Sequence, residues 1–242
     1  MKIIKLDAID STNSYLKRLL SKDSLDDLTV VVSKHQTRGK GRNDNIWENE
    51  ASLNLAFSIY KKFNKLDVKD KFMLNVISSL SVFQLLKENN LNKLTIKWPN
   101  DIMTGKRKIS GILIENSVKG KFINHCVIGV GINVNQKKFK DLPNATSLLI
   151  ETGLKFSLNS LASRLAEIFS KNFSLFDINE DDLLEYYNSQ LFLKNKDSNF
   201  KGLDNKNFSG KIICVNKKGE LRIRKTNNEE VNYSENTIRF VS

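Results

Sequence analysis

Two strand-like runs joined by a short turn constrain the fold of this chain more than any other feature. The runs cover residues 109–115 and 122–134, and both are rich in β-branched and other apolar residues. The turn at 118–121 is short enough to bring them together as antiparallel neighbours, and a second short turn starts at Gly105. Further strand-like runs lie at 53–59 and 94–97. We therefore expect a mixed, largely antiparallel sheet rather than a doubly wound parallel one.

Three segments have the apolar spacing of helices that bury one face. Each repeats large apolar residues every three or four positions, which predicts core-facing helices packed on the sheet. The segments lie at 15–20, at 72–86 and after Ser157, and residues able to cap a helix precede the first one at 10–13. Together with the sheet, these segments indicate an α+β domain whose sheet is covered by helices.

The region after about Leu193 differs in character from the rest of the chain. It is rich in lysine and asparagine and then gives three short strand-like runs, two of them separated by a turn at Gly219. The runs cover 210–215, 221–224 and 237–241. So short a piece buries little core of its own, but it suits a small β-barrel docked on the larger part. We expect a catalytic domain at 1–192 and a small β domain at 193–242.

The balance of charge concerns partners rather than fold. Lysine and arginine number 39 against 27 acidic residues, which gives a net charge of +12 at pH 7. This excess favours the approach of acidic proteins, nucleotides or nucleic acid without choosing among them. Part of this excess is equally consistent with a general composition bias of the source toward lysine, asparagine and isoleucine. No helix-turn-helix, zinc-finger or aromatic RNA-binding signature is present.

The sequence also bears on the compartment. No apolar run approaches the roughly 20 residues that cross a bilayer, and the N-terminus lacks the features of a signal peptide. Cys126 and Cys214 lie far apart inside apolar runs, without metal-ligand spacing, so we expect buried thiols in a reducing compartment and no zinc site. The expected location is the cytoplasm.

Residues 36–42, which read Gln-Thr-Arg-Gly-Lys-Gly-Arg, have the composition of an anion-binding loop. Gly39 and Gly41 let the backbone approach a ligand closely, while Lys40 and Arg42 supply charged donors for phosphate or carboxylate. Trp47 follows and offers a flat surface on which a base can stack. The alternative is a solvated basic turn between two strands, because short motifs of this kind are common by chance.

Two other segments place small or polar residues where a ligand could lie. Ser11, Thr12 and Asn13 stand at the expected start of a helix, where they can cap its free N–H groups or hold a polar ligand. Gly129 and Gly131 interrupt a strand, which suggests the close approach of a ligand or of another part of the chain. No third glycine opens a following helix, so this is not a dinucleotide fingerprint.

Residues 97–101 and 107–115 lie at the ends of two expected strands, where chemistry is often placed. Trp98 is expected in the core. Asp101 is a candidate to help hold a metal-bound phosphate, or else to pair with Lys97. Lys108 can neutralise charge that develops on a carboxylate or phosphate, although a solvated hairpin lysine is the simpler reading. With no nucleophile motif present, these segments together indicate binding of a nucleotide and a carboxylate.

These motifs, in this order along nearly the whole chain, resemble those of the biotin protein ligases. The resemblance implies a class II synthetase-like catalytic domain followed by an SH3-like β-barrel. It implies that biotin and MgATP form biotinyl-5′-AMP, and that a lysine of the biotin carboxyl carrier domain of acetyl-CoA carboxylase, or of a related carboxylase, then accepts the biotin. Because the chain starts at the catalytic domain, the expected form is monofunctional, with no DNA or membrane partner; a homodimer is left open.

The resemblance also assigns roles to individual residues. Lys108, Arg42 and Lys40 would be catalytic, Trp47, Asn133 and Asp101 would contact the nucleotide, and Asp101 is the one candidate for contact with magnesium, through MgATP. The residues implied to bind biotin or biotinyl-AMP are Ser11, Thr12, Asn13, Gln36, Gly39, Lys40, Gly41, Arg42, Lys108, Gly111 and Gly131.

Two positions depart from the family pattern. Lys40 and Asn45 stand where arginine is frequent in the family, which weakens the expected grip on anions. The alternatives to a biotin ligase are a lipoate or octanoate ligase of the same superfamily and, in a different class, a protein that only binds a nucleotide or nucleic acid.

Overall fold

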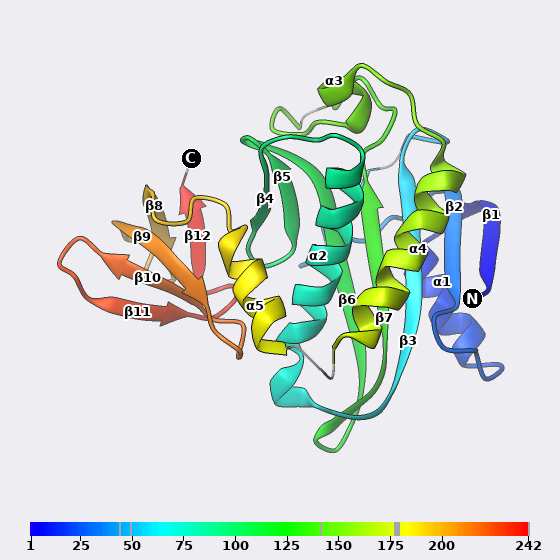
Figure 1. Ribbon diagram of the computed structural model, residues 1–242, viewed down its shortest axis with the longest axis horizontal. Helices are drawn as coiled ribbons and strands as arrows, with labels where there is room; N and C mark the ends of the chain where they lie inside the picture. The colour runs from blue at the N-terminus through cyan, green and yellow to red at the C-terminus, as the bar shows by residue number, and fades with distance from the viewer. Residues whose placement is uncertain (44, 49, 141, 177–179, 242) are drawn as a thin grey trace.

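The larger of two sheets organises the molecule (Figure 1). The computed structural model describes residues 1–43, 45–48, 50–140, 142–176 and 180–241. Within them this sheet has seven strands in the order β1-β2-β3-β7-β6-β5-β4. Its strands are β1 (Ile3–Ile9), β2 (Val30–Gln36), β3 (Leu55–Asp67), β4 (Leu94–Lys97), β5 (Asp101–Thr104), β6 (Arg107–Lys119) and β7 (Phe122–Ile132). β1 and β2 are parallel and the other neighbours antiparallel, so the prediction of a mixed, largely antiparallel sheet is confirmed.

The two hairpins predicted around β6 are present. Gly105 and Gly120 lie at their tips with φ of +56° and +61°, a conformation that side chains other than glycine adopt at a cost. The structure corrects one detail, because residues 101–104 form the additional strand β5. Asp101 therefore begins a strand and Lys108 lies inside β6, so both are fixed by ladder hydrogen bonds rather than carried on a loop.

Helices cover both faces of the larger sheet, and one face carries more helix than the other (Figure 1). The helices α2 (Phe72–Glu88) and α4 (Leu158–Ser174) pack side by side over one face, and α1 (Thr12–Leu20) lies on the other. Strand alternation on β3 divides the side chains: Phe57 stacks on Phe169 of α4, whereas Ser58 faces α1. The remaining helical segments are η1 (Val68–Asp70), α3 (Leu148–Thr152) and α5 (Glu180–Ser189), which packs beside α2.

The predicted helix starts are confirmed. Ser11 caps α1 and accepts a hydrogen bond from Ser14 N at 3.5 Å, and Ser157 caps α4 and accepts one from Ser160 N at 3.3 Å. No described helix combines the length and hydropathy needed to cross a membrane. Cys126 is buried as expected, but Cys214 is only half-buried.

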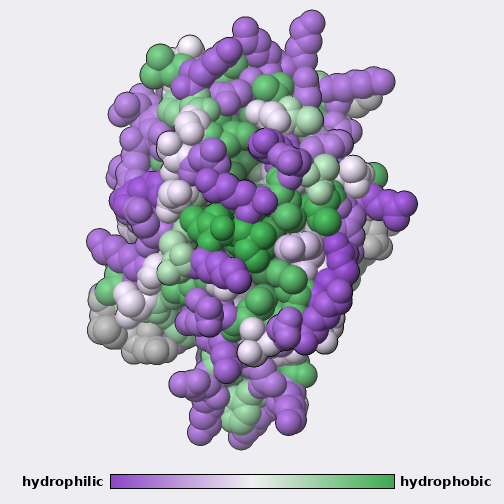
Figure 2. Space-filling view, turned by 90° about the vertical axis from the view of Figure 1, so that its right-hand side faces the viewer, coloured by the Kyte–Doolittle hydropathy of each residue, from purple (hydrophilic) through white to green (hydrophobic). Residues whose placement is uncertain are grey.

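Figure 2 shows the face of the molecule on the side of β1. Hydrophobic surface gathers at the centre of this face and hydrophilic residues surround it. β1 ends the strand order, so its outer edge has no partner strand within the described residues.

A smaller antiparallel sheet follows, in the order β11-β10-β9-β8-β12. Its strands are β8 (Asp197–Gly202), β9 (Asn207–Val215), β10 (Leu221–Lys225), β11 (Glu230–Tyr233) and β12 (Ile238–Val241). The three predicted runs are confirmed as β9, β10 and β12. Trp98 is buried as predicted, and its Nε1 donates to the carbonyl of Gly219 at 3.0 Å, which ties the smaller sheet to the larger one.

Candidate functional site

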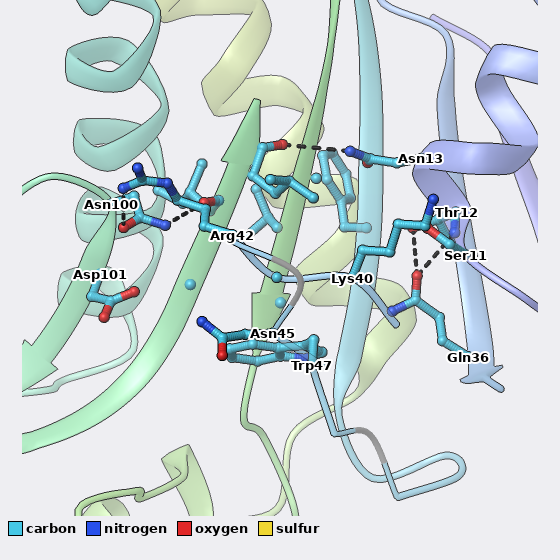
Figure 3. A pocket seen from close by; sticks show the side chains of 18 of the residues that line it. Ser11, Thr12, Asn13, Gln36, Lys40, Arg42, Asn45, Trp47, Asn100 and Asp101 are labelled. Atoms are coloured by element: carbon cyan, nitrogen blue, oxygen red, sulfur yellow. Dashed lines mark hydrogen bonds between the residues drawn. The ribbon is translucent and has the colours of Figure 1, made fainter. Parts of the chain in front are cut away.

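A cavity of about 250 Å³ lies where the start of α1 meets β3, β6 and β7 (Figure 3). Most residues that the sequence indicated for the site line it together, although they come from distant parts of the chain. These are Ser11, Thr12, Asn13, Gln36, Lys40, Gly41, Arg42, Trp47, Asp101, Lys108, Gly111 and Gly131.

Two indicated residues do not line this cavity. Gly39 belongs to residues 36–43, called the basic loop from here on, and its carbonyl accepts a hydrogen bond from Trp47 N at 3.0 Å. Asn133 is buried, and its backbone bonds to Ile109 and to Leu148.

A chain of hydrogen bonds fixes the polar end of the cavity, and Figure 3 shows its beginning at Thr12 and Gln36. Thr12 donates to Gln36 Oε1 from its backbone N at 2.9 Å and from its hydroxyl at 3.0 Å. Ser58 Oγ lies 2.7 Å from Thr12 Oγ1 and 2.6 Å from Asn13 Oδ1. Asn13 Nδ2 in turn donates to Glu115 Oε2 at 2.8 Å. Since both amides have defined partners, the donors and acceptors of this end are set before any ligand arrives.

The sequence did not single out Ser58 or Glu115 for a role in this chain. A serine inside the apolar run of β3 was the available signal for Ser58, because a buried hydroxyl needs a partner. Glu115 ends a predicted strand, and nothing in the sequence connects it to α1. In the structure it also pairs with Lys17 at 2.5 Å.

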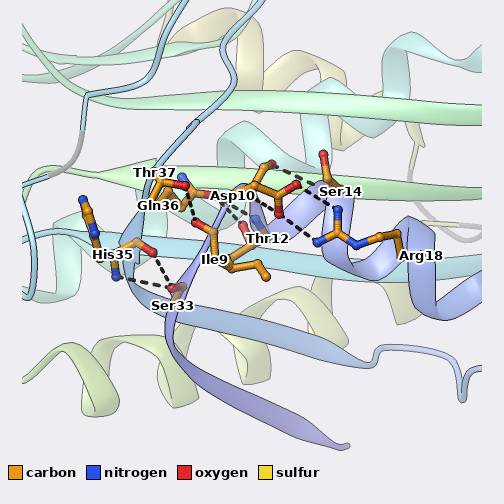
Figure 4. A network of polar contacts seen from close by, with 10 residues as sticks. Ile9, Asp10, Thr12, Ser14, Arg18, Ser33, His35, Gln36 and Thr37 are labelled. Carbon is orange, nitrogen blue, oxygen red and sulfur yellow. Dashed lines mark hydrogen bonds and ion pairs between the residues drawn. The ribbon is translucent and has the colours of Figure 1, made fainter.

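A second network supports the start of α1 from outside (Figure 4). Asp10 accepts two hydrogen bonds from Arg18, both at 2.8 Å, and one from Ser11 N at 2.8 Å. The hydrogen bonds from Arg18 are the main cause that lowers the pKa of Asp10 to about 2. Arg38 N donates to the carbonyl of Asp10, so the same turn also holds the beginning of the basic loop.

The strand glycines admit close contacts, as the sequence suggested, and in this structure the contacts are side chains. A Cβ on Gly129 would meet Asn13 Oδ1 at 2.5 Å, and one on Gly131 would overlap the indole of Trp47. A Cβ on Gly111 would lie 2.9 Å from the nearest atom of the same indole. The indole of Trp47 thus lies against the backbone of β6 and β7, and its Nε1 is buried without a hydrogen-bond partner among the described residues.

Lys108 stands beside this indole. Its Nζ lies 5.5 Å from the ring centroid of Trp47 and 2.7 Å from Asp101 Oδ1, and its side chain is 37% exposed. The suggested pair between Asp101 and Lys97 is wrong, because Lys97 lies over the ring of Phe240 instead. Backbone hydrogen bonds with Asn144 and Thr146 hold Lys108 from its other side.

Arg42 closes the cavity on the side of β5 and β6. Its Nη1 donates to Asn100 Oδ1 at 3.2 Å, and Asn100 Nδ2 donates to the carbonyl of Ile112 at 2.6 Å. A carboxylate from the smaller sheet, Glu235, forms an ion pair with Arg42. Burial lowers the pKa of Arg42, and the charge of Asp101 opposes that effect. No sequence pattern pointed to Glu235 as a partner of the basic loop.

Comparison with known proteins shows which family the chain belongs to. The sequence model of the biotin/lipoate A/B protein ligase family matches residues 6–133, which is more than half of the chain. The chain belongs to this family.

Individual relatives within the family are distant. The chain is 29% identical over 162 residues to the bifunctional ligase/repressor BirA of Salmonella typhimurium, covering 66% of this chain and 50% of that protein. It is 30% identical over 167 residues to the biotin--[acetyl-CoA-carboxylase] ligase of Mycobacterium tuberculosis, covering 66% and 61%. The chain thus spans about half the length of several curated relatives that it matches.

Among solved structures, the biotin protein ligase of Aquifex aeolicus in complex with biotin and ATP has a TM-score of 0.82 at 25% identity, with 99% of both chains covered. The biotin protein ligase of Leishmania major in complex with biotinyl-5-AMP has a TM-score of 0.66 at 18% identity, covering 97% of this chain and 99% of that one, and so shares the fold.

Proposed function

We propose that this protein is a biotin protein ligase, which activates biotin with MgATP and transfers it to a lysine of the biotin carboxyl carrier domain of acetyl-CoA carboxylase or of a related carboxylase. The observation that carries the proposal is the cavity, where a fixed polar end at Thr12 and Gln36 meets cations at Arg42 and Lys108. The Aquifex aeolicus ligase that resembles the chain over its whole length was solved with biotin and ATP, which supports the same ligands here.

The polar end would receive the neutral head of biotin. The residues for this role are Ser11, Thr12, Asn13 and Gln36, with the backbone at Gly41. The backbones of Gly111 and Gly131 would join them once the indole of Trp47 moves aside, and Gly39, which does not line the cavity, would act by shaping the loop. Because the polar side chains already have fixed hydrogen-bond partners, they present set donors and acceptors at little cost in entropy.

The cations would serve the first half-reaction. A biotin carboxylate oxygen attacks the α-phosphorus of ATP, an O–P bond forms, the bond to the β-phosphate breaks, and pyrophosphate leaves. Two anions must approach each other for this step, so Lys40, Arg42 and Lys108 would act by screening charge and by positioning. Lys108 has Asp101 as its present partner, and substrate phosphate would compete for it.

The nucleotide would occupy the neighbourhood of Trp47, with Asp101 beside the phosphates. Asn133 does not line the cavity, so a contact with it would require the nucleotide to reach beyond the lining residues. Asp101 is the one carboxylate that lines the cavity within the described residues. A single carboxylate together with substrate phosphates suits Mg²⁺ that arrives as MgATP.

In the second half-reaction the ε-amine of the carrier lysine attacks the acyl carbon of biotinyl-AMP. A C–N bond forms, the C–O bond to AMP breaks, and the amine loses a proton. The basic loop would shield the anhydride from water until then.

We also propose the finer architecture: a class II synthetase-like domain at 1–192 and an SH3-like barrel at 193–242. The bridge between Ile96 and Leu191 supports the boundary, because it joins 191 to the larger sheet. A homodimer through the outer edge of β1 is consistent with the apolar centre of that face (Figure 2). ATP as a substrate fits a location in the cytoplasm.

The test is pyrophosphate release from MgATP with biotin, with lipoate, or with neither. Release that only biotin triggers, followed by biotin transfer to a carrier domain, is expected. Release triggered by lipoate instead would assign the chain to the lipoate branch, which the family model also covers. If neither biotin nor lipoate triggers pyrophosphate release, the protein binds its ligand without activating it.

A further inference from the structure

The turn between β11 and β12 lies against the basic loop, although about 190 residues separate them in sequence. Glu235 forms the ion pair with Arg42, and Asn43 Nδ2 donates to Asn236 Oδ1 at 3.1 Å. These two neighbouring contacts join consecutive residues of one loop to consecutive residues of the other. Such a paired contact fixes orientation better than a single surface ion pair does.

The turn itself has a defined shape. Asn236 has φ of +68°, and both the N–H and the hydroxyl of Thr237 donate to the carbonyl of Ser234, at 3.1 and 2.6 Å. Its ends continue directly into β11 and β12. The carboxylate of Glu235 is therefore presented by a compact turn rather than by a free chain end.

The sheet that carries this turn is fastened to the larger one at independent points. Asn188 of α5 donates to the carbonyl of Val215 at 3.0 Å and accepts from its N–H at 2.6 Å. The hydrogen bond from Trp98 to Gly219 is a further attachment. Because the sheet is anchored elsewhere, the turn does not depend on the basic loop for its position.

Arg42 forms the wall between two spaces. On one side it lines the active cavity, and on the other it lines a cleft of about 500 Å³ between the two sheets, together with Asn75, Asn116 and Glu235. Its side chain is 24% exposed. Asn100 accepts from it inside the cavity wall and Glu235 pairs with it from the cleft, so Arg42 has one partner on each side.

We propose that Glu235 and Asn236 are positioning residues that hold the basic loop over the cavity, so that the C-terminal sheet supplies part of the lid. This inference rests on the proposed function only for its kinetic consequence. Glu235 fixes Arg42 for the anion that forms during the reaction, and Asn236 fixes the next residue of the loop. When the contacts are lost, the loop samples open states more often, and the apparent affinity for substrates falls by the fraction that remains closed.

Trypsin gives a first test that needs no activity, since Arg38, Lys40 and Arg42 are its cleavage sites. Without ligands, Glu235→Ala should be cut within residues 38–42 about fivefold faster than the parent, and Glu235→Gln by an intermediate factor. Asn236→Gly, chosen because φ is positive there, should also be cut faster. Glu230→Ala is the matched control, because Glu230 pairs with Arg224 on the same sheet away from the loop.

Steady-state kinetics give the second test. In Glu235→Ala, KM for biotin and for ATP should rise about fivefold while kcat stays within about twofold, and Glu230→Ala should match the parent. A purely structural role would lower the melting temperature without this split between KM and kcat. Unchanged cleavage of the loop, or a KM that falls because Glu235 competes with the substrate anion, would overturn the proposal. If loop cleavage responds but the parent releases no pyrophosphate, the lid contact stands and the proposed function fails.

Discussion

Under the proposed function, the environment of Lys108 would let its ammonium group pair first with Asp101 and then with a substrate phosphate. It lies beside a carboxylate and beside an aromatic face, both of which attract a cation, and its backbone is held on both sides. The Coulomb attraction to Asp101 keeps the ammonium near the cavity when no phosphate is present. A substrate phosphate carries more charge than one carboxylate, so it would replace Asp101 as the partner of the Lys108 ammonium group.

Replacement of Lys108 tests this role. Lys108→Ala should lower the rate of biotin-dependent pyrophosphate release by about 100-fold or more, because the charge that screens the two reacting anions is lost. The free energy of unfolding should change by less than about 1 kcal/mol, since a partly exposed ion pair contributes little. Arg107→Ala removes the neighbouring cation, which pairs with Glu151 outside the cavity, and should leave the rate unchanged. If the free energy of unfolding of Lys108→Ala falls enough to explain the loss of activity, the role of Lys108 is structural.

Gly131 permits a second test at the level of one methyl group. In Gly131→Ala the new Cβ would overlap the indole of Trp47, so the ring must move away from the strands. KM for ATP should rise about fivefold or more, because stacking on a base depends on where that ring lies. Tryptophan fluorescence should change as well.

The control for the glycine variant is Gly202→Ala. A Cβ there meets only the end of the Asp204 side chain, at 3.0 Å, which can move aside. If KM for ATP is the same in Gly131→Ala, in Gly202→Ala and in the parent, the position of Trp47 does not affect nucleotide binding.

The sequence located most of the cavity residues because each belongs to a local pattern. The serine, threonine and asparagine before α1, and the glycines and cations of the basic loop, are recognisable from their neighbours alone. Ser58, Asn43 and Glu235 are not, since each takes part only through a residue far away in sequence. Long-range partners of this kind have no signature in a single chain.

At the scale of elements, the start of α1 connects the outer network to the cavity. Asp10 anchors the residue that caps the helix, and its pKa falls from the ordinary 3.8 to about 2, chiefly through Arg18. A carboxylate whose pKa is lower in the folded state stabilises that state above its unfolded pKa. This contribution is lost as the pH falls through the folded value.

Asp10→Asn should therefore be less stable than the parent at pH 6, by about 0.5–1 kcal/mol because the pair is solvent-screened. The difference should narrow as the pH falls from about 4 toward 2, where the parent carboxylate also becomes neutral. Urea unfolding at a series of pH values measures it. Asp7→Asn is the comparison variant: Lys34 lowers the pKa of Asp7 as well, so the stability difference should have the same sign but a smaller size, because this carboxylate lies on a strand and not at the helix start. A difference that stays constant with pH would exclude the charge of Asp10 as its cause.

Elements with strong periodicity were predicted well and short polar ones were missed. α2 and α4 bury long apolar faces, and β6 and β7 are long apolar strands, so their patterns were clear. β5 has only four residues and α5 begins with three acidic ones, so packing on their neighbours decides both. β1 does show apolar residues at Ile3, Ile4, Leu6 and Ile9, and that signal was available.

For the whole molecule, the net charge of +12 is large for a chain of this size and bears on encounter rather than on folding. If the partner is a carrier domain with an acidic surface, the excess of lysine would raise the frequency of productive encounters, because opposite charges steer association. The chemistry inside the cavity should be much less sensitive to salt, since its charges are partly buried and close together.

Salt therefore separates these two effects. The second-order rate constant for biotinylation of an acidic carrier domain should fall about tenfold as the ionic strength rises from about 0.02 to 0.5 M, because the Debye length shrinks from about 20 Å to about 4 Å. Pyrophosphate release with biotin and ATP alone, measured over the same range, controls for any effect of salt on the first half-reaction. A transfer rate that stays constant while the carrier is limiting would show that the lysines do not steer the encounter, and would leave compositional habit as the source of the charge excess.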